Sequence, residues 1–211
     1  MRLFRTLLNS GRGKRTRAQF LEATRLYFDQ YPTDVDPKCG LIESFYEWFV
    51  FDFRPGDTGP TAVEDYLRIR GPRLPARERA MLESWRDSRF GFWEVRRVEE
   101  GTGFEVKDVF AGDLVFVDEP SLDYPLAPGD YLVGRIEEFE GLSKFGPHAL
   151  HLSGPLFLAM AEMIEEDSRA MGQEPAAYVR ANTHRWYRLV RETAARLPAD
   201  EPECPEAASV P

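Results

Sequence analysis

Residues 90–117 read FGFWEVRRVEEGTGFEVKDVFAGDLVFV, and this stretch decides the fold that the sequence predicts. Short runs rich in Val and Phe alternate with polar residues and are interrupted by Gly-containing turns, which is typical of β-strands. The same pattern continues to residue 152, whereas apolar residues recur at helical spacing on both sides of it. The sequence therefore predicts an α+β fold with a small five-stranded antiparallel β-barrel, SH3-like or OB-like, flanked by N- and C-terminal helices.

The strands of this barrel are expected at 92–98, 104–110, 114–117, 131–137 and 149–152. A two-residue period places every second side chain on one face of a sheet. The residues expected on one side are Trp93 and Val95, Phe104 and Val106, Leu114 and Phe116, and Tyr131 and Val133. The pattern does not separate an SH3-like barrel from an OB-like one.

The chain divides into five segments on composition and periodicity. These are a basic N-terminal arm (1–15), a helical region (16–89), the small β-barrel (90–153), C-terminal helices (154–196) and a disordered acidic tail (197–211). Thr61 and Glu64 have the spacing of a capping box and predict a helix start. Pro175 is expected to open a final helix that carries Val179, Thr183, Trp186 and Val190 on one face.

The net charge of −9 is unevenly distributed, because residues 1–20 hold six basic residues and no acidic one. Such an arm either binds a polyanion or lies against the acidic body of the same chain. The residues predicted to bind a polyanion are Arg12, Lys14, Arg15 and Arg17. Cys39 and Cys204 stand far apart, which favours free thiols and a cytoplasmic location. No apolar run approaches the roughly 20 residues of a membrane-spanning helix.

Several phrases of the sequence are similar to a known group of proteins. They lie at 45–52, 85–89, 92–95, 103–113 and 128–136. Together they resemble the shared body of bacterial SEC-C motif proteins, and the resemblance covers residues 41–136. Many members of that group carry closely spaced cysteines that bind zinc. Here Cys39 and Cys204 stand alone, so the zinc motif is absent, and the resemblance implies an architecture and a bacterial setting but no activity.

Two sets of residues are candidate sites of chemistry. Glu47 and Asp52 flank Trp48, and they are either a carboxylate pair suited to proton transfer or a solvent-facing Glu and a helix-ending Asp. The histidines His148, His151 and His184, with Glu162 and Glu165, could form a metal site only if the fold brings them together. The acidic run at 162–167 is better explained as a solvated helix face. Motifs of nucleophilic or phosphate-binding enzymes are missing. The sequence therefore assigns no catalytic residue, no metal and no cofactor.

The function expected from these features is that of a non-catalytic cytoplasmic binding or adaptor protein. The side chains proposed to contact a partner are Phe92, Trp93, Lys107 and Arg135. Exposed aromatics beside basic residues are used by barrels that bind single-stranded nucleic acid. The strands are mostly acidic, however, so the expected partner is a protein or a ribonucleoprotein rather than free DNA. One alternative is a hydrolase with an acidic and histidine site between barrel and helices, and another is a structural subunit. The sequence does not decide the oligomeric state.

Overall fold

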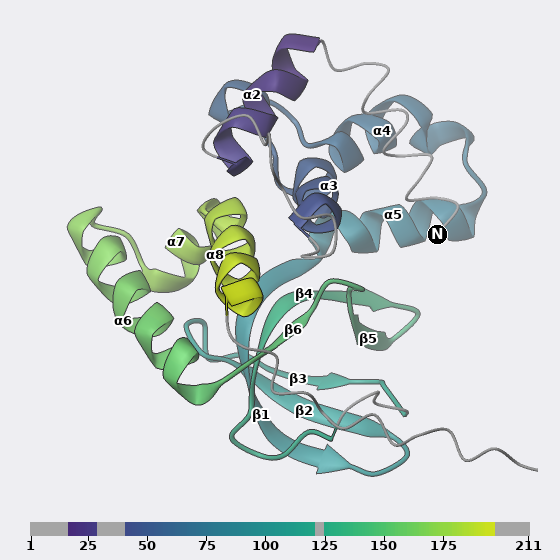
Figure 1. Ribbon diagram of the computed structural model, residues 1–211. Coiled ribbons are helices and arrows are strands. Elements are labelled where there is room, and N and C mark those ends of the chain that lie inside the picture. The colour runs from purple at the N-terminus through teal and green to yellow at the C-terminus, as the bar shows by residue number, and fades with distance from the viewer. Residues whose placement is uncertain (1–16, 29–40, 121–124, 197–211) are drawn as a thin grey trace, which may run out of the picture.

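The computed structural model describes residues 17–28, 41–120 and 125–196. It has an α+β architecture in which helices precede and follow a single antiparallel sheet (Figure 1). The basic arm at 1–15 and the acidic tail at 197–211 lie outside the described residues, as do both cysteines. None of the helices in the described residues combines the length and the apolar character that a bilayer crossing requires.

The first two helices pack through aromatic rings. These are α2 (Arg17–Phe28) and α3 (Leu41–Phe51). Phe20 and Tyr27 of α2 lie edge-on to Phe45 of α3, at centroid distances of 5.8 and 5.3 Å. Eight apolar or aromatic side chains fall within the eleven residues of α3, so nearly its whole circumference is buried. A helix that is apolar on all sides must be covered on all sides, and α3 lies between α2, α4 and α8.

The helices α4 (Ala62–Arg70) and α5 (Ala76–Asp87) form a hairpin, joined by the short 3₁₀ helix η3 (Gly71–Arg73). A further 3₁₀ turn, η2 (Pro55–Asp57), precedes it. The capping box at the start of α4 is confirmed. Glu64 donates its backbone N–H to the Thr61 hydroxyl at 3.3 Å, and the Glu64 carboxylate accepts from the Thr61 N–H at 2.8 Å.

The sheet has six strands. They are β1 (Arg89–Glu99), β2 (Gly103–Asp108), β3 (Leu114–Val117), β4 (Tyr131–Phe139), β5 (Leu142–Phe145) and β6 (Leu150–Leu152). Their order is β3-β2-β1-β4-β5, and β6 also pairs with β4. All pairs are antiparallel, and a register shift between Val95 and Arg97 bends β1. Bulges of this kind increase the local twist and curl a sheet. Strand β5 was not expected from the sequence.

The sheet curls into a half-barrel, so the prediction of a closed five-stranded barrel is wrong in this respect (Figure 1). The edge strands β3 and β5 lie close together but are not paired, and two hydrogen bonds join the two edges just beyond the end of β3. There the Asp118 N–H donates to the Ser143 carbonyl at 2.7 Å, and the Asp118 carboxylate accepts from the Ser143 N–H at 2.8 Å. Each edge strand is four residues long. The two edge strands therefore do not form the continuous ladder of hydrogen bonds that would close a barrel.

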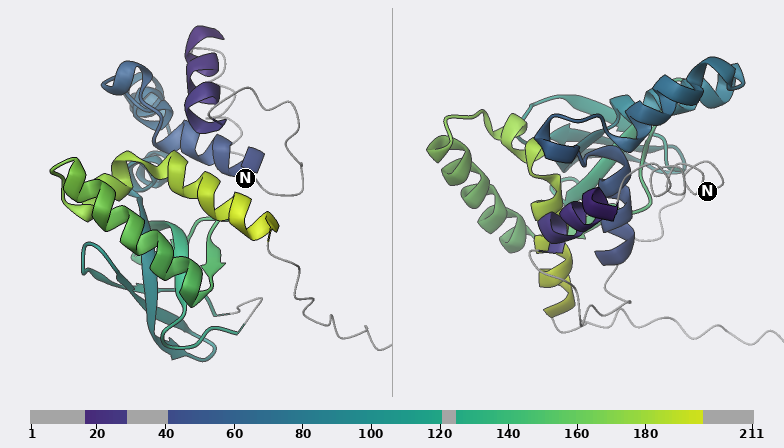
Figure 2. Two further views of the ribbon diagram at one scale, coloured as in Figure 1. Left: turned by 60° about the vertical axis from the view of Figure 1, so that its left-hand side comes forward. Right: turned by 90° about the horizontal axis from the view of Figure 1, so that it is seen from above.

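The last three helices cover one face of the sheet, as Figure 2 shows: α6 (Gly154–Ala170), α7 (Pro175–Ala181) and α8 (Thr183–Arg196). The single final helix expected from Pro175 onward is in fact divided at Asn182, whose φ of −119° is not helical. The face predicted for it is nevertheless buried, because Val179, Thr183, Trp186 and Val190 are all nearly inaccessible.

The alternation along β1 divides the apolar core in two. Phe90 and Phe92 face the helices, whereas Trp93 and Val95 fill the inside of the half-barrel. A third cluster joins α3 to the α4–α5 hairpin and centres on Leu82.

The sequence predicts the wrong inward-facing side chains for two strands, β3 and β4. The side chains inside the half-barrel are Val115 and Val117 of β3 and Leu132 of β4, not the neighbours that the sequence indicated. Leu114 is 60% exposed, and Tyr131 and Val133 pack on the helical side. Both strands carry consecutive apolar residues, so their sequence does not distinguish the two faces.

Candidate functional site: an open groove and a buried ion cluster

The residues predicted to bind a polyanion are mostly outside the part of the chain that the structure describes. Arg12, Lys14 and Arg15 fall there, while Arg17 is the first residue of α2 and is exposed. Binding of a polyanion by the arm therefore stays a prediction.

The residues predicted to contact a partner are mostly inside the protein, which corrects that prediction. Phe92 and Trp93 are each 0% exposed, and Arg135 is 3% exposed. The Trp93 indole N–H donates to the Gly134 carbonyl at 3.0 Å. Only Lys107, which is half-buried, reaches the surface. Side chains with no accessible surface cannot form a docking patch, because both faces of β1 are covered.

Arg135, on β4, is the centre of a buried ion cluster. Its Nη2 donates to Asp52 Oδ2 at 2.5 Å, and its Nε lies 3.5 Å from Glu47 Oε1. Its Nη1 donates to the carbonyl and the hydroxyl of Ser88 at 3.3 and 3.2 Å. The ring of Phe51 lies 4.9 Å from the guanidinium carbon. These contacts connect the end of α3 and the start of β1 to the middle of the sheet.

Glu47 and Asp52 both reach this guanidinium although a helix would place them about 140° apart. Asp52 follows the last residue of α3, so its direction is not fixed by the helix. The planar fork of Arg135 then bridges the two carboxylates. The interpretation of Glu47 as a solvent-facing residue is wrong, because its side chain is 4% exposed. The interpretation of Asp52 as a helix-ending residue is confirmed.

Tyr187 of α8 completes the ion cluster, which we define as Glu47, Asp52, Arg135 and Tyr187. Its hydroxyl donates to Glu47 Oε1. Burial and the nearby Glu47 raise the pKa of Tyr187 well above its usual value, so the phenol stays protonated. Burial alone would lower the pKa of Arg135, but Asp52, Tyr187 and Glu47 together raise it. Burial and Glu47 also raise the pKa of Glu137 on the same strand. The cluster is thus built around one permanent positive charge.

Two buried atoms of the ion cluster have no hydrogen-bond partner, Glu47 Oε2 and Arg135 Nε. The Nε2 atom of His148 lies 3.9 Å from Glu47 Oε2, which is beyond hydrogen-bond distance. In the described residues no three His, Cys, Asp or Glu side chains are grouped so as to hold a metal ion. His151 instead lies 3.7 Å from Asp130, and Glu162 and Glu165 are exposed on α6. The fold does not bring the predicted metal ligands together.

Asp52 also faces outward, into an open groove of about 780 Å³. The groove is formed by α2, by the end of α3 and the turn after it, and by the segment from the end of α6 to the start of α8. Its lining includes Leu26, Trp48, Asp52, Met171, Thr183 and His184. Asp52 Oδ2 accepts from the Thr183 hydroxyl at 3.1 Å as well as from Arg135. The ion cluster therefore fixes the carboxylate at the base of the groove. The sequence does not predict this groove, because its residues come from three segments that are far apart in the chain.

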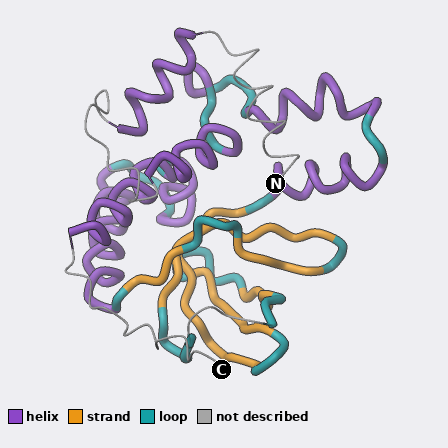
Figure 3. The backbone as a smooth tube through the Cα atoms, turned by 45° about the vertical axis from the view of Figure 1, so that its right-hand side comes forward, coloured by secondary structure: helices purple, strands orange, loops and turns teal. Residues whose placement is uncertain are grey.

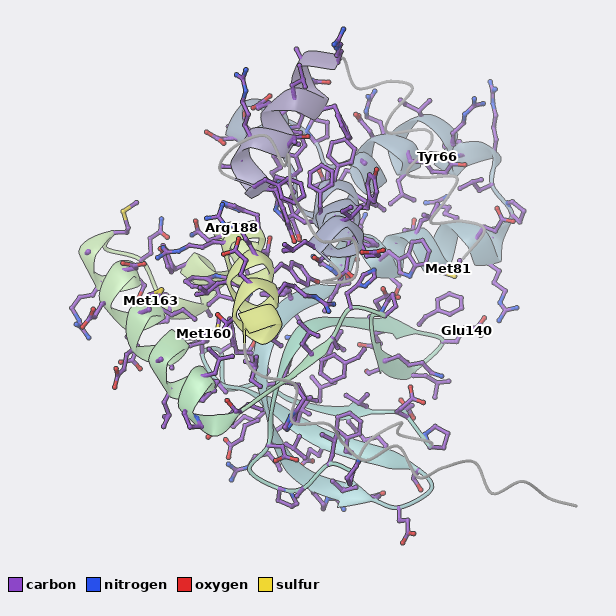
Figure 4. The ribbon with its side chains drawn as sticks, in the orientation of Figure 1. Tyr66, Met81, Glu140, Met160, Met163 and Arg188 are labelled. Atoms are coloured by element: carbon purple, nitrogen blue, oxygen red, sulfur yellow. The ribbon has the colours of Figure 1, made fainter. Side chains whose placement is uncertain are left out.

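His184 lies on the wall of the groove and packs on Trp48, with ring centroids 5.4 Å apart. Burial, together with the nearby Arg188 and Arg185, lowers the pKa of His184 to about 4. Its imidazole is therefore neutral at pH 7 and offers one donor and one acceptor to whatever occupies the groove. Figure 4 shows Arg188, one of these two arginines, beside α8.

We expect His184 to make the protein less stable in mild acid. Unfolded histidine takes a proton near pH 6.5, whereas folded His184 does so only near pH 4. The unfolded chain binds more protons in this interval, so stability falls as the pH falls through it, by up to about 3 kcal/mol. Urea unfolding at about pH 7 and about pH 4.5 measures this loss. His184→Gln should lose less stability than the wild type over the same interval, and equal losses would contradict the assignment. Glu137 contributes in the opposite direction in both proteins.

Comparison of the chain with protein-family models, with curated proteins and with solved structures found no match. The resemblance to SEC-C motif proteins stays a prediction. The site is therefore interpreted from its own geometry.

Two pairs of a carboxylate and a histidine are relevant to the hydrolase alternative. Glu47 is buried near His148 between the sheet and the helices, as that hypothesis requires, but the two are not hydrogen-bonded and the side chain of Glu47 is sealed from solvent. Asp52 and His184 both line the groove, but no hydrogen bond joins them in the described residues. The Oδ2 of Asp52 is already held by Arg135 and Thr183. Neither pair has the arrangement of a base oriented by a carboxylate.

Proposed function

We propose that the protein is a non-catalytic binding or adaptor protein, and that the groove receives an extended segment of a protein partner. The observation that carries this proposal is the open groove of about 780 Å³, a volume in the range of ligand-binding clefts. Its walls come from α2, α3, α7 and α8, which pack on one another and so form a preformed cleft.

The groove is lined by both apolar and polar side chains. Leu26 on α2 is 45% exposed, and Met171 after α6 is 66% exposed. Large apolar side chains exposed beside a groove are typical of binding surfaces, and the flexible methionine adapts to different partners. Gln173, Asn182 and His184 add amide and imidazole groups. This combination suits a peptide, whose side chains are partly apolar and whose backbone offers donors and acceptors.

The polar groups at the base of the groove are already hydrogen-bonded to other residues of the protein, which favours binding over catalysis. Asp52 is held by Arg135 and Thr183, and Asn182 donates its side-chain amide to the Tyr178 carbonyl at 2.8 Å. Side chains held in this way present a fixed pattern of hydrogen-bonding groups. Preorganisation of this kind reduces the entropy cost of binding.

The groove can be tested with a peptide display library and three variants. Peptides selected on the wild type should bind Met171→Asp and Leu26→Asp about tenfold more weakly or worse, because an anion replaces an apolar contact at the edge. Leu158→Asp is the matched control, since Leu158 on α6 is 60% exposed and does not line the groove. Affinity is measured by fluorescence anisotropy with the selected peptides.

The Leu158→Asp control distinguishes binding in the groove from non-specific binding to exposed apolar side chains. Peptides that bind the Leu158→Asp variant as well as the wild type, and the other two variants poorly, support the proposal. Failure to enrich any peptide, or equal affinity for all four proteins, would show that the groove is not the binding site.

A further inference from the structure

The hairpin of α4, η3 and α5 projects from the rest of the molecule. We call residues 62–87 the finger and residues 68–77 its tip. The finger packs on α3 and β4 through its base, and the tip points away from α6, α7 and α8 (Figures 2 and 3). At the tip, Arg77 contacts Glu140 in the turn between β4 and β5. Tyr66 and Met81, labelled in Figure 4, show its two helices side by side.

The tip holds four arginines and no acidic residue, in a chain whose net charge is −9. They are Arg68, Arg70, Arg73 and Arg77. Arg70 and Arg73 are exposed and make no ion pair with the described residues. The tip is therefore a local positive patch on an acidic protein, with Asp65, Glu78 and Glu140 as acidic neighbours. Seen from above, the finger extends to one side of the molecule (Figure 2).

Helix stability does not explain this pattern. Arg68 and Arg70 suit the last turn of α4, where a helix favours positive charge. Arg77 lies in the first turn of α5, where the helix dipole disfavours it, and Arg73 lies between the two helices. Glu78 is the one acidic residue of that first turn, so the turn carries one charge of each sign. Arg73 and Arg77 therefore gain no stabilisation from the helix dipoles.

The other two arginines of the tip, Arg68 and Arg77, form ion pairs that are largely exposed to solvent. Arg68 contacts Asp65 at 2.8 Å with its side chain 70% exposed, and Arg77 contacts Glu140 at 2.9 Å with its side chain 77% exposed. Glu140, labelled in Figure 4, belongs to the turn between β4 and β5. Exposed pairs of this kind contribute little to stability, so a stronger anion can replace either carboxylate.

We infer that the tip of the finger binds the phosphate backbone of a nucleic acid. The cations of the finger are all arginine and never lysine, and a guanidinium binds phosphate through two parallel hydrogen bonds. Pro72 and Pro75 stiffen the turn that presents them. A convex tip with dispersed arginines fits a polyanion that offers many equivalent phosphates.

An anionic membrane is a poorer fit to the same patch. Between residues 62 and 87, Ile69 is the one large apolar side chain that is clearly exposed, at 39%. Insertion at a lipid interface needs a wider apolar face with several large side chains. The arginines of the tip are therefore better suited to contact with an accessible sugar-phosphate chain.

The test measures binding of fluorescein-labelled single-stranded RNA, duplex RNA and duplex DNA, each of about 20 nucleotides and mixed sequence, at about 50 and 200 mM salt. We expect the full chain to bind at least one of them. Arg70→Glu with Arg73→Glu should weaken binding about tenfold or more at low salt. It should also reduce the slope of log affinity against log salt by about two, because two phosphate contacts are lost.

The matched control is Lys144→Glu with Arg169→Glu, which changes the net charge equally at two exposed positions outside both the finger and the groove. It should bind within about twofold of the wild type. A third variant replaces Arg12, Lys14 and Arg15 by Glu. Thermal unfolding of each variant confirms that the fold is retained.

Four outcomes would overturn the inference. They are no binding of any probe at low salt, equal loss in the finger variant and its control, loss confined to the arm variant, and finger-dependent binding to phosphatidylserine vesicles without binding to nucleic acid. The peptide assay of the groove is independent, because none of the variants used to test the groove lies in the finger.

Discussion

Replacing Arg135 by methionine is expected to destabilise the protein by about 3–5 kcal/mol. The side chain is 3% exposed, and it lies between the carboxylates of Glu47 and Asp52. Methionine fills a similar volume but leaves both acidic groups without a counter-charge in the interior. Breaking a buried ion pair from one side is costly because the remaining charge stays desolvated.

The size of this effect is measured by urea unfolding at neutral pH. Arg96→Met is the matched control, because Arg96 forms a 2.8 Å pair with Glu94 on the surface of the same sheet and its side chain is 48% exposed. It should cost no more than about 1 kcal/mol. A loss below about 1 kcal/mol for Arg135→Met would show that the ion cluster does not hold the sheet to α3.

A triple variant separates the lost charge from the lost packing. Arg135→Met combined with Glu47→Gln and Asp52→Asn removes the unpaired carboxylates. This protein should be more stable than Arg135→Met alone, since no uncompensated charge remains in the interior. Equal stability of the two would mean that the guanidinium acts through its hydrogen bonds to Ser88 and its contact with Phe51, not through charge.

Replacing Trp93 by alanine is expected to cost about 3–5 kcal/mol as well. Trp93 is fully buried inside the half-barrel, and its indole donates to the Gly134 carbonyl. The substitution leaves a large cavity and an unpaired backbone carbonyl. This result would distinguish a core residue from the partner-contact residue that the sequence indicated.

Leu114→Ala is the control for Trp93→Ala, because Leu114 lies in the same sheet but is 60% exposed. It should change the free energy of unfolding by no more than about 0.5 kcal/mol. The two variants are compared by denaturant unfolding. A Trp93→Ala protein as stable as the wild type would contradict the packing of the half-barrel.

Much of the secondary structure follows from local patterns in the sequence. Residue type and spacing alone predict the capping box at Thr61 and the strands β1 and β2. Strand β5 was missed because its four residues, 142–145, carry no clear alternation. The break at Asn182 was missed because the apolar spacing of α7 continues into α8.

The candidate site could be predicted only in part. The sequence indicates Glu47 and Asp52 together as a possible carboxylate pair, whereas it indicates Arg135 separately, as a partner-contacting residue. Arg135 lies 83 residues from Asp52. A pairing over that distance leaves no local pattern, so sequence periodicity treated Arg135 as a surface cation. The four arginines of the finger tip are plain in the sequence, but nothing local shows that they project from the body.

The order of helices and strands was determined by the sequence itself, because the apolar period is a property of neighbouring residues. The tertiary structure alone decided the rest: that the barrel stays open, which side Leu132 faces, and that an arginine from β4 is buried between two carboxylates. These features depend on contacts between segments distant in the chain, where burial and desolvation outweigh local preference.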